Sequence, residues 1–230
     1  KAAERQLRLS VQGAYSGKGA GSEDLFWQGT LRDLTLTGPE GDLALAEPAA
    51  IRVGETRLQV DPFCLDHKGQ RMCGRLRAEG EPGMNWKDFS LAAMLQGKTH
   101  ELGFVTALVP EIDRMAGELE ADIQLTGTLG APQLEGVLAL SSGEMDLFAV
   151  NLLLRQVDMR LEMRGRALEL TGSAQAGEGK LAVDGRMEWK AGSPFGNLDL
   201  KGENLLVANV PEARIHASPN ISVGVDGRHI

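Results

Sequence analysis

The stretch from Gly117 to Trp189 is dominated by alternation of apolar and polar residues, and this pattern limits the fold more than any other feature. From Gly117 to Leu125 every odd-numbered residue is apolar or glycine, and every even-numbered residue is polar. Successive side chains of a β-strand point to opposite faces, so each such run has one apolar and one polar face. Runs of this kind, paired in antiparallel order, predict a broad sheet with a continuous apolar surface.

The alternation continues along the chain and predicts an all-β fold. It recurs in Val157–Met163 and in Leu181–Trp189, where Gly185 takes an apolar position. Turn signals separate the runs at spacings of about 10–15 residues, as repeated hairpins would produce. In the first half we expect strands near Gln6–Gln12, Leu25–Leu36, Asp42–Leu45, Ile51–Val53, Arg57–Val60 and Met72–Ala78.

The pattern divides the chain into three segments. Residues 1–87 form a β segment with a hairpin around the two cysteines, and residues 117–230 form the main β domain. Between them, residues 88–116 lack strand alternation, as the spacing of Leu91 and Leu95 shows. We expect this junction to form one or two short helices that end at Pro110.

Composition argues against several classes of function. The chain has 230 residues and a net charge of −8, with acidic and basic residues interleaved. Since no basic stripe exists, nucleic acid is not an expected partner. No stretch approaches the roughly 18 consecutive apolar residues of a transmembrane helix. Motifs for nucleophilic serines, phosphate-binding loops and zinc-binding helices are missing, so we expect no enzyme, no cofactor and no metal site.

Both ends of the sequence suggest a piece of a longer protein. The chain begins at Lys1 without an initiator methionine, and it stops at Ile230 just after an alternating run. We therefore expect any targeting signal to lie outside this sequence.

The two cysteines suggest a disulfide. Cys64 and Cys73 bracket a short polar turn that contains Gly69. A hairpin around Asp66–Gly69 would place them on neighbouring strands, where opposed Cα atoms lie about 4.5–5.5 Å apart. That separation suits a disulfide, and an even pair of cysteines in a strand-rich protein indicates an oxidising compartment.

Two other interpretations of the cysteines remain open. Cys64, His67 and Cys73, together with His100, offer a set of zinc ligands, although a second closely spaced pair is missing. Alternatively, both cysteines are free and buried as small apolar residues.

A resemblance to a known family covers nearly the whole chain. The runs Gly127–Leu140 and Gly177–Gly185 resemble hallmark stretches of the TamB family of Gram-negative bacteria. The family's next strands and turns are similar, in the same order, to Leu200–Asn204, Asn209–Glu212 and Ser218–Ile221. In the first half, the similarity extends to Pro48–Ala49, to Cys64–Gly74 and to Trp86.

The resemblance implies a periplasmic protein, anchored in the inner membrane through a segment that this sequence lacks. Members of the family look like AsmA-like, bridge-type lipid carriers. Their antiparallel sheet is curled into an open, taco-shaped trough (a β-taco) with an apolar interior, which carries phospholipid between the inner and outer membranes. They also pair with the Omp85-family barrel TamA, a partner that we expect only through the full-length protein.

On this resemblance, the apolar faces of the second half line the trough. Flexible Leu and Met side chains shield acyl tails without directional bonds, and Trp27 and Trp189 are expected at a rim or end. Without the resemblance, the same residues suit the closed core of a β-sandwich. The lining residues that we predict are Leu119, Ile123, Leu125, Leu138, Leu140, Val157, Met159, Leu161, Met163, Leu168, Leu170, Leu181, Val183, Met187 and Leu198.

A second function agrees with the same sheet. A chaperone-like scaffold for outer-membrane proteins such as autotransporters would receive an extended strand at an open sheet edge. Strand addition needs a long unprotected edge, whereas lipid transport needs only the lined interior.

Overall fold

A computed structural model describes residues 6–16, 26–38, 41–102, 112, 114–147, 152–190, 193–210 and 213–227. Within these ranges the chain consists of strands and one short 3-10 helix, η1 (Trp86–Asp88), so the all-β prediction is confirmed. The described residues include no helix with the length and apolar character that a membrane crossing requires. Pro110 and the two chain ends, which enter the sequence-based expectations, lie outside the described ranges.

Most strands belong to one antiparallel sheet. In chain order they are β1 (Gln6–Ser16), β2 (Phe26–Gly38), β3 (Gly41–Leu45), β4 (Ala49–Gly54), β5 (Arg57–His67), β6 (Gln70–Glu79), β7 (Ser90–Thr99), β8 (Arg114–Thr128), β9 (Ala131–Leu147), β10 (Leu152–Gly165), β11 (Ala167–Ala176), β12 (Gly179–Lys190), β13 (Ser193–Glu203), β14 (Leu205–Val210), β15 (Ala213–Ala217) and β16 (Asn220–Asp226). In the described part of the chain, 14 strands hydrogen-bond in the order β1-β2-β3-β5-β6-β7-β8-β9-β10-β11-β12-β13-β16, and β4 pairs with β2 and β5. β14 and β15 form a separate two-stranded sheet.

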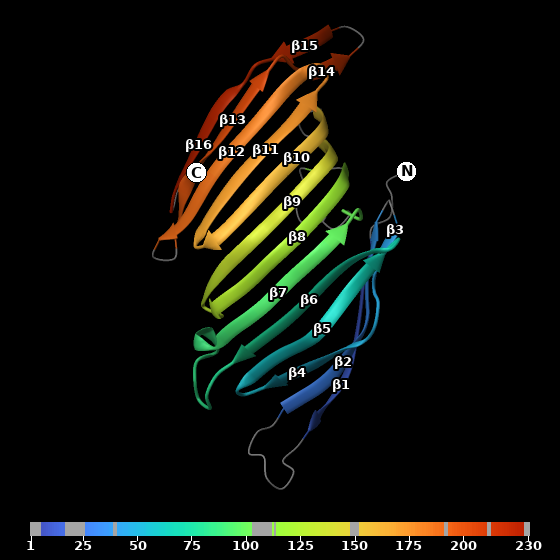
Figure 1. Cartoon of the computed structure of the whole chain (residues 1–230), viewed down its shortest axis with the longest axis vertical. Helices are drawn as coiled ribbons and strands as arrows, with labels where there is room; N and C mark the ends of the chain where they lie inside the picture. Colours follow the sequence, from blue (N-terminus) through green and yellow to red (C-terminus); the bar gives the residue numbers. More distant parts are fainter. Residues whose placement is uncertain are drawn as a thin grey trace. The chain divides into compact units, whose positions relative to one another are not determined.

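The chain packs into two compact units. Unit 1 comprises Lys1–Glu101 and Ala121–Glu135, and unit 2 comprises Leu102–Glu120 and Gly136–Ile230. Strands β8 and β9 therefore each contribute residues to both units. Within unit 2, Figure 1 shows β10, β11, β12, β13 and β16 side by side, coloured from yellow to red. The three segments expected from the sequence stay a prediction.

The expected helices in residues 88–116 are wrong where the structure describes this stretch. Ser90–Thr99 forms strand β7, whose residues 90–97 pair with β6. Leu91 and Leu95 lie on the same face of this strand. Their alternation is hidden in the sequence because Met94, on the opposite face, is also apolar, and because Ala, Met and Leu favour helices locally. Pairing with β6 overrides that local preference.

Unit 1 contains the predicted disulfide. Cys64 on β5 stands directly opposite Cys73 on β6, their Cα atoms are 4.0 Å apart, and their sulfurs are bonded. The disulfide prediction is confirmed, and the zinc-ligand and free-thiol interpretations are wrong, because both sulfurs are used in this bond. A structural disulfide indicates a non-reducing compartment.

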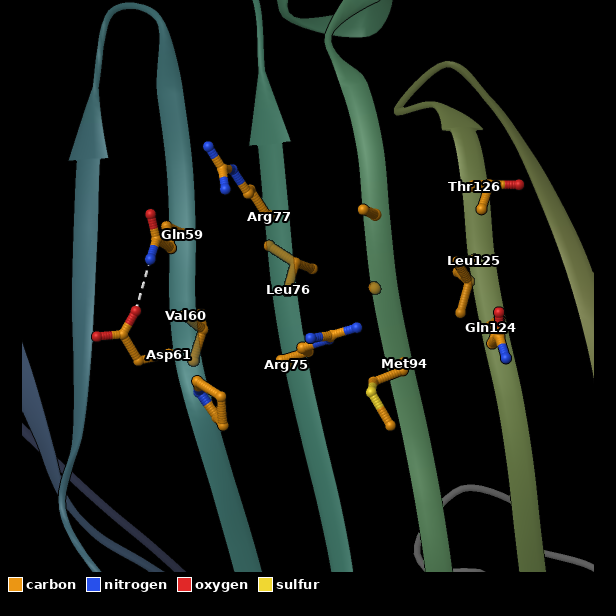
Figure 2. A pocket seen from close by; sticks show the side chains of 13 residues that line it. Gln59, Val60, Asp61, Arg75, Leu76, Arg77, Met94, Gln124, Leu125 and Thr126 are labelled. Carbon is orange, nitrogen blue, oxygen red and sulfur yellow. Dashed lines mark hydrogen bonds between the residues drawn. The ribbon is translucent and has the colours of Figure 1, made fainter.

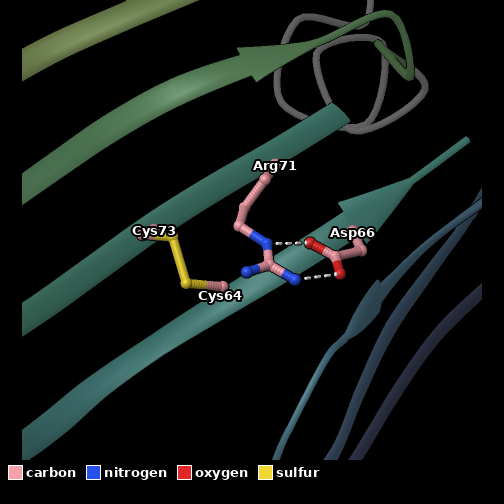
Figure 3. The surroundings of a disulfide bond; sticks show 4 residues. All are labelled: Cys64, Asp66, Arg71 and Cys73. Carbon is pink, nitrogen blue, oxygen red and sulfur yellow. Dashed lines mark hydrogen bonds and ion pairs between the residues drawn. A yellow bond between two sulfur atoms is a disulfide. The ribbon is translucent and has the colours of Figure 1, made fainter. Parts of the chain in front are cut away.

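The local geometry of this hairpin explains why the cysteines meet. Lys68 and Gly69 at its tip both have positive φ, 46° and 85°, as the tight turns that match the twist of paired strands require. Beside the disulfide, Arg71 donates from Nε and Nη2 to the two carboxyl oxygens of Asp66, at 2.7 and 2.8 Å (Figure 3). The hydrogen bond from Arg71 lowers the pKa of Asp66.

Candidate functional site

The principal candidate site is the apolar face of unit 2, which the strand registers assemble from β10, β11, β12, β13 and β16. Residues directly opposite each other in an antiparallel pair point to the same face of the sheet. A row of such pairs runs across all five strands, so its side chains share one face. In strand order, this central row consists of Leu161, Leu170, Gly185, Leu198 and Val223.

Two further rows lie on the same face, one on each side of the central row. The first consists of Met159, Gly172, Val183, Leu200 and Ile221, and the second of Met163, Leu168, Met187, Gly196 and Val225. Each row holds one glycine, and a neighbouring side chain leans over the glycine of the central row. A Cβ added at Gly185 would lie 3.0 Å from Cδ1 of Leu198. The three rows therefore make a continuous aliphatic surface that carries no hydrogen-bonding side chain.

The opposite face of the same strands is polar. Glu162 accepts hydrogen bonds from Arg160 Nε at 2.9 Å and from Arg164 Nη2 at 2.6 Å, and the bond from Arg160 lowers the pKa of Glu162. On this polar face, one row of paired residues runs across the five strands and consists of Arg160, Thr171, Asp184, Asp199 and Ser222. Ion pairs and hydrogen bonds between neighbours thus satisfy charges on this surface.

Side chains at one end of the apolar face form a buried cluster. Four of its members come from outside the five face strands: Leu119 on β8, Leu140 on β9, and two residues outside the main sheet. Of the latter two, Leu102, which follows β7, is 1% exposed, and Leu205, the first residue of β14, is 2% exposed. These two residues therefore cover this end of the face. The buried members of this unit 2 cluster are Leu102, Leu119, Leu140, Leu154, Val157, Ala174, Ala176, Leu181 and Leu205.

Toward the other end the face is more open. Leu198 is 39% exposed, and Trp189, which pairs with Pro194 near the end of β12, is 38% exposed. In unit 1, Trp27 is half-buried, and its indole ring lies where a Cβ at Gly29 would be. In unit 2, Met163 on β10 is nevertheless 4% exposed, so the accessible part of the face lies toward β12 and β13, where Trp189 and Leu198 are.

The predicted lining residues fall into three groups. Seven belong to the unit 2 cluster or pack against it: Leu119, Leu138, Leu140, Val157, Met159, Leu181 and Val183. Six others share the face through strand register: Leu161, Met163, Leu168, Leu170, Met187 and Leu198. The remaining two, Ile123 and Leu125, belong to unit 1, where Leu125 packs against Ala78, Phe89 and Leu91.

The sequence pattern did not predict the whole face, because in two strands the residues that point to it switch from even-numbered to odd-numbered positions. In β10, Gln156 has a φ of 47°, and the register skips one residue between Arg155 and Asp158. Such a bulge adds one residue, so Leu154 before it and Val157 after it can point to the same face. In β9, Ser142 has a φ of 51°, and Leu140 before it and Met145 after it belong to or pack against the same cluster although their numbers differ in parity. The missed residues of the cluster are Leu102, Met115, Met145, Leu147, Leu152, Leu154, Ala174, Ala176, Leu200, Leu205 and Val207.

Unit 1 offers a second and more polar candidate, a depression of about 620 Å³ over β5, β6, β7 and β8. Figure 2 shows side chains from these four strands around it. Asp61 accepts a hydrogen bond from Gln59 at 2.6 Å and forms an ion pair with Arg52 at 3.2 Å. Arg77 forms an ion pair with Glu79 at 2.8 Å. Asp61 and Arg77 thus each have an oppositely charged neighbour on the same sheet, whereas Arg75, which also lines the depression, has no ion pair among the described residues.

The described residues contain no group of three or more His, Cys, Asp or Glu side chains placed to hold a metal ion. Comparisons with known proteins identify no relative, since no protein-family model, curated protein or solved structure matches the chain.

Proposed function

We propose that this chain is part of a bridge-type carrier that moves phospholipid tails along the apolar face of its sheet, between the inner and outer membranes of a Gram-negative envelope. The observation that carries the proposal is the register of β10, β11, β12, β13 and β16, which aligns three rows of aliphatic residues across these five strands. The resemblance of Gly127–Leu140 and Gly177–Gly185 to the TamB family supports the same function.

An aliphatic face of this kind suits acyl tails. A sixteen-carbon tail left in water costs on the order of 12 kcal/mol, because each methylene gains about 0.8 kcal/mol on burial. The three rows offer no directional bond that would hold the tail at one position. Their methionines, Met159, Met163 and Met187, are flexible and polarizable, so they adapt to a chain that slides past them.

The disulfide and the resemblance support the compartment that we propose. The bond between Cys64 and Cys73 indicates a non-reducing compartment, and the proposal places the carrier in the periplasm. In the full-length protein, an inner-membrane anchor and the outer-membrane barrel TamA would complete the assembly, as the resemblance implies.

Native mass spectrometry of the protein purified in mild detergent tests this function. We expect one or more phospholipids to remain bound to the wild-type chain. Leu170→Asp places a carboxylate on the apolar face and should abolish binding, because a tail would have to desolvate the charge. Thr171→Asp places the same group on the polar face of the same strand and should keep the lipid. A lipid-free wild type, or equal lipid in both variants, contradicts the proposal.

A chaperone-like scaffold is the second candidate, and the edge strand β16 favours it. Among the described strands, β16 pairs with β13 alone, and Ile221 on it is 49% exposed. The unpaired edge of such a strand can accept another strand. Val223→Pro would interrupt this edge. If the scaffold function holds, a peptide copied from an outer-membrane barrel strand should cross-link to β16 in the wild type and not in Val223→Pro.

A further inference from the structure

The chain inserts β14 and β15 between β13 and β16, although these two strands are already neighbours in the main sheet. Lys201 of β13 pairs with Asn220 of β16, and the Gly202 N–H donates to the carbonyl oxygen of Pro219 at 2.8 Å. A two-residue turn can connect antiparallel strands at this separation. Instead, the chain leaves the main sheet and forms the β14–β15 hairpin before it returns as β16.

The β14–β15 hairpin lies over the covered end of the apolar face. β14 contacts β10, β11 and β12, and Leu205 packs in the cluster with Val157 and Leu181. Leu206 approaches the turn between β11 and β12, since a Cβ added at Gly177 would lie 2.8 Å from the Cβ of Leu206. Figure 1 shows β14 and β15 at one end of the unit 2 strands. The hairpin thus covers the buried cluster, whereas the central row around Leu198 stays more open.

Side-chain packing, and no backbone ladder, attaches the hairpin to the face. Among the described strands, β14 pairs with β15 alone. The Asn204 N–H donates to Ser218 Oγ at 3.0 Å, a bond that closes the base of the hairpin itself. On its solvent side, Ile215 is 52% exposed. The hairpin can therefore leave the face without breaking a ladder of the main sheet.

We propose that the β14–β15 hairpin is a displaceable strap, and that acyl tails reach the cluster around Leu181 only when this strap lifts. The inference rests on the proposed lipid function. A tail binds only to molecules in which the strap has left the face. Its apparent affinity is therefore the intrinsic affinity multiplied by the fraction of molecules whose face is uncovered.

A strapless chain tests the inference. It replaces residues 203–218 with Asn-Gly, and dioctanoyl phosphatidylethanolamine serves as the probe in a titration. If the strap covers the face in about nine molecules of ten, its removal should raise the affinity about tenfold. Ile215→Ala changes the solvent side of the hairpin and should bind as the wild type does. Should the strapless chain fail to fold by circular dichroism, Leu205→Ser is the second variant and should raise the affinity in the same direction.

Amide hydrogen exchange supplies the second readout. Adding the same lipid to the wild-type chain should accelerate exchange in Leu205–Val207, because the strap is then displaced. Equal affinities of the wild-type, strapless and Leu205→Ser chains, or unchanged exchange in the lipid-bound chain, would overturn the strap and leave the lipid function standing. Absence of binding in all of these chains would overturn both.

Discussion

Leu161 of β10 stands directly opposite Leu170 of β11, and both lie on the apolar face of unit 2. The next pair along these strands, Glu162 and Glu169, lies on the opposite face. Adjacent residues on one strand therefore lie on two different surfaces of the sheet. Substitutions one residue apart can then separate an effect on binding from a general effect on the strand.

The two ends of the apolar face should differ in their tolerance of charge. Leu161→Asp should lower the free energy of unfolding by about 1–3 kcal/mol, because this half-buried site still reaches water. Leu140→Asp should prevent unit 2 from folding, since residue 140 is 5% exposed and its charge would be buried without a partner. Urea unfolding monitored by circular dichroism measures both. A loss at Leu161 as large as that at Leu140 would show a sealed face.

In cells, a charge on the apolar face should impair the outer-membrane barrier. Val183→Arg in the full-length protein should sensitise cells to detergents at normal protein abundance, because the cation opposes passage of a hydrocarbon tail. Asp184→Arg is the matched control, since residue 184 follows on the same strand and lies on the polar face. Normal barrier function with normal abundance of Val183→Arg would count against the carrier.

Acidification should weaken unit 2. The hydrogen bond from Ser222 holds the pKa of Asp199 below its ordinary 3.8, and that from Arg160 holds the pKa of Glu162 below its ordinary 4.5. The native state then binds fewer protons than the unfolded state, so this stabilisation is complete above the ordinary values and is lost as pH falls through the lowered ones. We expect Tm to fall as the pH is lowered below about 5, and Glu162→Gln to reduce that fall.

The control for the pH series is Glu178→Gln, which removes an exposed carboxylate of unit 2 without a described ion pair. It should leave the pH dependence of Tm as it is in the wild type. An unchanged dependence in Glu162→Gln would mean that this carboxylate contributes nothing to acid sensitivity.

Removing the disulfide should destabilise unit 1. The bond closes a short loop between residues 64 and 73, and the double variant Cys64→Ala, Cys73→Ala should lose about 2–3 kcal/mol of unfolding free energy. Reduction of the wild type should have the same effect, and a reductant should leave the double variant unchanged. Equal stability of the oxidised and reduced wild type would contradict the prediction.

The sequence predicts the strands of this protein well where one face is apolar and the other polar. It fails in β7, because Met94 makes the second face apolar as well and hides the alternation. It also fails to predict which residues of β10 before Gln156 point to the apolar face. The positive φ at Gln156 causes this shift, and it is a backbone property that residue polarity does not encode. Membership of Leu102 and Leu205 in the cluster depends on tertiary packing, so no local pattern could have revealed it.

Photo-cross-linking tests the central claim most directly, because it asks which face of the sheet touches lipid. A benzoylphenylalanine replaces Leu161 on the apolar face or Arg160 on the polar face of the same strand, in the full-length protein in living cells. Irradiation at residue 161 should attach a phospholipid that mass spectrometry identifies, and irradiation at residue 160 should not. No phospholipid at residue 161, or equal amounts at both positions, would contradict the account.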